Sequence, residues 1–196
     1  MPIGPGGLDS NGIWQFGEDD SEALASDLLN LGMGSVSTAI STLGGVLQVV
    51  STTKTDTFTM NSSTFTDVTG LSVSITPTSS TSKIFVMFDA NLGNQYGTNI
   101  AVIRLMRDTT PIFVGTDVGS RTPLAAQGYN RSSTTMTQVG GSTLDAPATT
   151  AAVTYKIQLR WQNSGAIVAV NRSVVDSNVE GVGRGASSIT VWEVAG

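Results

Sequence analysis

Hydrophobic and polar residues alternate with a period of two through most of the chain after residue 46. The clearest case is 71–76, where Leu71, Val73 and Ile75 alternate with two serines and a threonine. Because successive side chains of a β-strand point to opposite faces of a sheet, this pattern predicts a strand with one buried face. Similar alternation at 154–161 and 187–194 predicts two more strands of this kind.

Two other segments, 83–88 and 99–107, are apolar on both faces and are predicted to be central strands. Short apolar runs separated by Gly, Pro, Asn or Ser predict about ten strands in residues 46–196, with no helical period among them. The expected fold class is therefore mainly β, an antiparallel β-sandwich over 46–196 preceded by a short N-terminal arm and helix over 1–45.

The predicted helix occupies residues 20–31. The acidic run at 18–22 is favourable at a helix start, where backbone N–H groups and the helix dipole attract negative charge. Three leucines then follow at i, i+4 and i+7, on one helical face. Before this helix, residues 1–12 are rich in Pro and Gly and are expected to be irregular.

Apolar residues spaced alternately by four and three run from the helix into the first strand. This heptad spacing is typical of helices packed about a shared axis and predicts an oligomeric stem. Four glycines between positions 32 and 45 favour the alternative of a helix, a loop and a strand with accidental spacing. The stem residues are Leu29, Met33, Val36, Ile40, Leu43 and Leu47.

A second apolar group in the arm consists of Ile13, Trp14 and Phe16. Aromatic side chains exposed to water on so short a segment are unfavourable unless another protein surface packs against them. We expect either docking to another protein through these residues or a tuck against the protein's own domain.

The amino-acid composition excludes or disfavours several classes of function. The chain has no Cys and no His, so it can form neither a Ser-His-Asp triad, nor a thiolate nucleophile, nor a zinc site of Cys/His type. A net charge of −5 argues against nucleic-acid binding, and no apolar run is long enough for membrane insertion. The first residues lack the features of a signal peptide, so we expect the protein to be made and kept in a cytoplasm.

We expect no catalytic residue, no metal and no cofactor, and therefore no enzyme. A glycan depolymerase that uses two carboxylates is the alternative. Against it, the acidic residues after position 50 are scattered singly, mostly at predicted turns.

Residues 115–150 are rich in Gly, Ser, Thr and Ala and are expected to include long loops. Loops on a rigid scaffold often carry recognition. The alternative is a solvated crossover between sheets. The candidate contact residues in this region are Arg121, Gln127, Tyr129, Asn130 and Arg131.

Ordered phrases along the chain carry a resemblance to a known family. They are VLQVVS at 46–51, TDVTGLSVSITP at 66–77, SKIFV at 82–86, LDAP at 144–147, TYKIQ at 154–158, VNRS at 170–173 and ASSITVWEV at 186–194. Over about 150 residues the chain resembles a module found in tail fibres and other virion proteins of bacteriophages.

This module is similar to the trimeric jelly-roll knobs of the tumour-necrosis-factor and complement-C1q class. The resemblance implies a homotrimeric structural protein of the virion, with phage tail or capsid proteins as partners. A tail fibre or spike that binds a host cell-surface glycan or protein non-covalently is expected, since 12–16 and 27–30 resemble the starts of small phage tail proteins. The resemblance further implies assembly in the host cytoplasm, virion attachment through Ile13, Trp14 and Phe16, a trimer stem at the heptad residues, and receptor contact through the candidate contact residues of 115–150. A capsid head fibre or decoration protein is the alternative.

Overall fold

The structure is a computed structural model that describes residues 7–8, 14–15, 45–95, 100–162 and 167–196. The chain divides into two compact units, Met1–Gly45 and Val46–Gly196. In the first unit, β1 (Gly7–Leu8) pairs antiparallel with β2 (Trp14–Gln15). The predicted helix at 20–31 lies outside the described residues.

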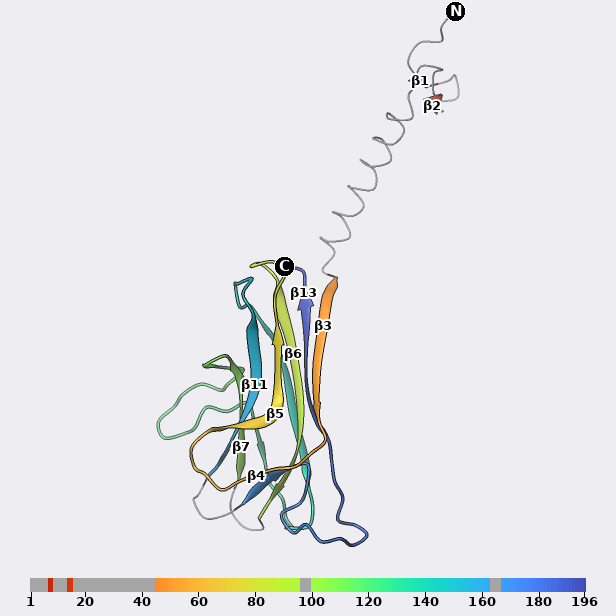
Figure 1. The fold of residues 1–196 in the computed structure, drawn as a ribbon. Coiled ribbons are helices and arrows are strands. Elements are labelled where there is room, and N and C mark those ends of the chain that lie inside the picture. The colour runs from red at the N-terminus through yellow and green to blue at the C-terminus, as the bar shows by residue number, and fades with distance from the viewer. Residues whose placement is uncertain (1–6, 9–13, 16–44, 96–99, 163–166) are drawn as a thin grey trace, which may run out of the picture. The chain divides into compact units, whose positions relative to one another are not determined.

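Four long strands form the main part of one sheet in the second unit. They are antiparallel neighbours in the order β3 (Val46–Lys54), β13 (Ser187–Val194), β6 (Lys83–Asn94) and β10 (Thr137–Asp145). β12 (Val168–Val170) also pairs with β6 and carries β4 (Phe58–Met60) on its other side. Figure 1 shows β3, β13 and β6 running side by side.

The second sheet is built around β11 (Val153–Trp161), which lies between β5 (Thr66–Ile75) and β7 (Ala101–Arg107). The free edge of β7 is completed by two short strands, β8 (Thr110–Ile112) and β9 (Ala126–Gly128). All these pairings are antiparallel, as the period-two pattern predicted.

Inward side chains from both sheets form one hydrophobic cluster. Its largest members, Trp161, Tyr155 and Phe88, are almost completely buried. Leu71, Val73 and Ile75 point into the same cluster, which confirms the burial expected from their alternation. Burying one such apolar side chain contributes about 1.5–3 kcal/mol.

The mainly β, antiparallel fold class is confirmed, and the described residues contain no helix. Two sheets around one shared cluster are consistent with a β-sandwich.

Candidate self-association face and display loops

An apolar row crosses the outer face of the first sheet. Trp192 on β13 lies opposite Val49 on β3 and opposite Phe85 on β6, and Phe85 in turn lies opposite Leu144 on β10. The four side chains share one face because directly opposed residues of an antiparallel pair point the same way. We call Val49, Trp192, Phe85 and Leu144 the apolar row.

This row is open to solvent in the single chain. Val49 and Leu144 are each 53% exposed, and Phe85 and Trp192 are half-buried. The two rings contact each other, with centroids 5.4 Å apart and planes tilted by 50°. Such an apolar surface, continuous across four strands, marks an interaction site more often than a solvated surface.

The next row on the same face adds apolar surface without charge. Met87 on β6 is 44% exposed and lies between Thr190 and Ser142. Beside it, Thr190 shares a hydrogen bond of 2.7 Å with Ser51. The row after Met87 along β6 contains a charged residue, Asp89, which accepts a hydrogen bond of 2.6 Å from the Ser188 hydroxyl. The centre of this face can therefore bind only through apolar and neutral polar contacts.

The structure separates the candidate receptor-contact residues into two groups. Arg121, Gln127, Tyr129 and Arg131 are exposed. Arg121 and Gln127 line the same pocket. Asn130 differs from the other four, because it is only 2% exposed.

Asn130 fastens its loop to β6. Its Nδ2 donates hydrogen bonds to the carbonyl oxygens of Leu92 at 2.9 Å and Thr135 at 3.2 Å, and its Oδ1 accepts one from the Thr137 hydroxyl. We therefore replace the contact role predicted for Asn130 with a positioning role. An Asn within a Ser-rich loop gives no local signal of such burial.

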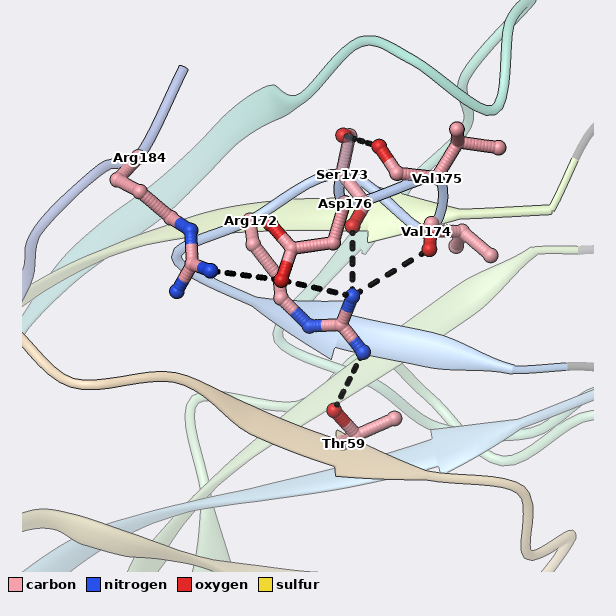
Figure 2. Close-up of polar contacts among 7 residues, drawn as sticks. All are labelled: Thr59, Arg172, Ser173, Val174, Val175, Asp176 and Arg184. Atoms are coloured by element: carbon pink, nitrogen blue, oxygen red, sulfur yellow. Dashed lines mark hydrogen bonds and ion pairs between the residues drawn. The ribbon is translucent and has the colours of Figure 1, made fainter. Parts of the chain in front are cut away.

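The connection from β12 to β13 is held by a cluster of polar contacts (Figure 2). Arg172 Nη1 donates to the carbonyl oxygens of Ser173 at 3.4 Å and Val174 at 3.3 Å, and Nη2 donates to Thr59 Oγ1 at 3.2 Å. The carboxylate of Asp176 lies 2.6 Å from Arg184 Nη2 and 3.5 Å from Arg172 Nη1. This arrangement links both ends of the connection through one acidic side chain.

The same connection is tied to the loop that carries Arg131. The backbone N–H of Val175 donates to the carbonyl oxygen of Ser133 at 2.9 Å. Asn171 anchors the start of the connection, because its Nδ2 donates to the carbonyl oxygens of Lys54 and Asp56 at 2.8 and 3.0 Å. These loops are thus supported by the strands around them, as a binding surface requires.

The candidate attachment and stem residues fall mostly outside the described residues. Trp14 lies in β2, but Ile13 and Phe16 are not described. Leu47 lies in β3 as an exposed strand residue, so the last position of the heptad series is not helical. The other five stem residues, Leu29, Met33, Val36, Ile40 and Leu43, lie outside the described residues.

Within the part of the chain that the structure describes, no three acidic side chains gather as a metal site would need. That part also contains no helix with the length and apolar character to cross a membrane.

Comparisons with known proteins add little to this geometry. No family model matches the sequence, and the search of curated proteins finds no match. A solved structure described as that of infectious bursal disease virus, Gx strain, is similar over 99% of this chain and 44% of the viral chain, with 13% sequence identity and a TM-score of 0.39. The chain therefore spans less than half the length of this viral protein, and similarity at this level establishes neither a shared family nor a shared function.

Proposed function

We propose that this chain is a structural protein of a bacteriophage virion, and that its β-unit is a self-associating display module of jelly-roll type. The division of the strands between two layers supports the jelly roll: β3, β13, β6 and β10 with the short β12 and β4 form one sheet, and β5, β11 and β7 with β8 and β9 form the other. A jelly roll likewise divides antiparallel strands between two sheets. The ordered phrases at 46–51, 66–77 and 186–194 support the phage origin.

The apolar row carries the proposal of self-association. The centres of protein interfaces are depleted of charge and enriched in aromatic residues and Met. Trp192, Phe85 and Met87 match that composition, and their neighbours in the same two rows are uncharged. A partner with a strongly charged surface would find nothing there to pair with, whereas a second copy presents the same apolar face. Three copies about an axis would bury this face in each subunit.

The exposed residues between β8 and β10 supply the display role. Arg121, Gln127, Tyr129 and Arg131 are accessible, while contacts such as those of Asn130 and Asp176 hold the surrounding loops in place. Weak individual contacts repeated by three subunits would add up through avidity. We propose a non-covalent receptor-binding role at the tail for this module, with attachment through the N-terminal arm.

Sedimentation velocity of the full chain tests self-association. The expected species has three times the 20.3 kDa mass of the chain. The double variant Val49→Asp/Leu144→Asp should be a folded monomer, because both side chains are exposed in the single chain and each new charge would be buried without a partner in the trimer.

Val118→Asp is the matched control, since Val118 is 49% exposed but lies in the loop between β8 and β9, outside the apolar row. A monomeric native protein would contradict self-association, as would a double variant that stays trimeric. The position on the particle is tested separately by labelling the chain in intact virions: a few copies at one vertex support the tail, and many copies over the shell contradict it.

A further inference from the structure

Two arginines flank one aromatic ring on the outer face of the second sheet. Cζ of Arg104, on β7, lies 3.8 Å from the centroid of the Phe65 ring, and Cζ of Arg160, on β11, lies 5.6 Å from it. Stacking on an aromatic face holds a guanidinium in a fixed orientation. Phe65 therefore places two cationic groups close together.

Neither arginine has an acidic partner among the described residues. Nε of Arg104 and Nε of Arg160 are buried and make no hydrogen bond there. Asp67, on the neighbouring β5, is engaged by Lys156 at 2.7 Å and Gln158 at 2.8 Å. Burial and the nearby Arg160 both lower the pKa of Arg104. Two partly desolvated cations without a counter-ion form an unfavourable arrangement that a bound anion would relieve.

A pocket of about 420 Å³ adjoins this pair, and Arg160 lines it. Arg121 supplies a second guanidinium from the loop between β8 and β9. The amides of Gln127 and Gln162 and the apolar side chains of Val102 and Leu124 also line it, and its lining includes no acidic residue. The volume is within the range of pockets that hold small molecules.

We infer that this pocket, which we call the arginine pocket, binds an acidic sugar. The planar guanidinium groups of Arg121 and Arg160 suit two-point hydrogen bonding to a carboxylate or a phosphate. Side-chain amides can pair with sugar hydroxyls, and Val102 and Leu124 can contact the C–H groups of a sugar ring.

This inference deepens the proposed display function by naming the ligand class, and its biological meaning rests on that function. The arginine pocket lies on the second sheet and the apolar row on the first. Self-association through the row would therefore leave the pocket accessible.

Saturation-transfer NMR on the full chain tests the inference with three probes: D-glucuronate, D-glucose 6-phosphate and neutral D-glucose. We expect transfer to at least one acidic sugar and none to glucose. Transfer to only one of the two identifies the anionic group as carboxylate or phosphate.

Arg121→Ala and Arg160→Lys should each weaken binding of the acidic sugar about tenfold or more, because each removes a two-point charged contact. Arg160→Lys keeps the positive charge, so a loss there points to the guanidinium fork. Lys83→Ala is the control: it removes one positive charge from an exposed residue of β6, on the first sheet, that does not line the pocket, and it should leave binding unchanged.

The inference is overturned if neither acidic sugar gives transfer, if glucose binds equally, or if Lys83→Ala weakens binding as much as Arg121→Ala. Thermal unfolding of each variant checks that its fold is intact. Sedimentation of the same samples keeps the two proposals distinguishable, since a monomeric chain that binds acidic sugars would contradict only the self-association.

Discussion

Tyr155 and Asp145 join the two sheets near one end of the β-unit. The phenolic hydroxyl of Tyr155, on β11, donates a hydrogen bond of 2.7 Å to Oδ2 of Asp145, on β10. Arg107, on β7, reaches the same carboxylate with Nη1, at 2.9 Å from Oδ1 and 3.0 Å from Oδ2. Burial, followed by the hydrogen bond to Asp145, strongly raises the pKa of Tyr155. One acidic group thus connects strands of both layers.

Tyr155→Phe should lower the free energy of unfolding by about 1–2 kcal/mol, because it removes the hydroxyl and leaves a partly buried carboxylate with one donor fewer. Chemical denaturation at neutral pH measures the change. Tyr129→Phe is the control, since Tyr129 is 48% exposed, and it should leave stability unchanged. Equal stability of the two variants would show that the hydrogen bond between the layers contributes nothing.

The buried carboxylate of Glu193 makes the stability of the fold depend on pH. It is fully buried, and it accepts hydrogen bonds from Gln48 Nε2 at 2.6 Å and from the backbone N–H and hydroxyl of Thr78 at 2.7 Å each. Burial alone would raise the pKa of this carboxyl, but the hydrogen bonds outweigh it and lower the pKa from 4.5 to about 2. The unfolded chain therefore takes up the proton at a higher pH than the folded chain.

Because of this difference, we expect the Glu193 carboxylate to contribute about 3 kcal/mol to the free energy of unfolding. This contribution is fully present above pH 4.5 and is lost as the pH falls towards 2. Glu193→Gln should be less stable at neutral pH and should lose less stability between pH 5 and 3 than the native protein. Glu180→Gln, at an exposed loop position, should keep the native profile. Asp56 and Asp67, whose pKa values are lowered by Lys54 and Lys156, contribute equally in all three proteins.

Gly93 on β6 has no room for a side chain. A Cβ atom there would lie 2.7 Å from Cα of Ser173 and would also clash with the carbonyl oxygen of Arg172. Gly93→Ala should therefore destabilise the fold by about 1–3 kcal/mol or more, since the neighbouring backbone must move. Gly183 has open space around its Cα, so Gly183→Ala should have little effect. Thermal unfolding of the pair tests this, and two similar midpoints would refute the close packing at Gly93.

The strands were the most predictable part of the molecule. Alternation at 71–76 and 187–194 reflects a local rule of backbone geometry, so it can be read without knowledge of the fold. The segment at 83–88 shows the limit of this rule. It lies within β6, between β13 and β10 as expected for a central strand, but Phe85 and Met87 face outward and are partly exposed. A sequence cannot distinguish residues covered by its own fold from residues that a second chain would cover.

The arginine pocket and the arginine pair beside it could not be predicted, because the residues that form them are far apart in the chain. Phe65, Arg104 and Arg160 come together through the order of β5, β11 and β7 and a shift of register between Lys156 and Gln158. For Arg121 and Gln127 the sequence shows only that they are polar residues in a region rich in Gly, Ser and Thr. Their shared pocket depends on how the loop before β9 crosses the sheet, which no local pattern determines.

Asp176 provides a test of whether the loop between β12 and β13 is ordered in advance. Its carboxylate is the acidic group between Arg172 and Arg184 (Figure 2), so Asp176→Asn removes the charge that draws the two guanidinium groups together. Partly exposed ion pairs contribute little to global stability, about 1 kcal/mol or less, and we expect the unfolding midpoint to change only slightly. Local opening of the loop should increase, because the ion pairs that hold its two ends together are lost. Hydrogen exchange measured by mass spectrometry should therefore become faster in peptides covering 172–185 and stay unchanged in β6 and β11.

Asp117→Asn, in the loop between β8 and β9, removes a charge at an exposed position and should leave that exchange rate unaltered. Equal exchange in the two variants would mean that the backbone contacts alone keep the loop ordered.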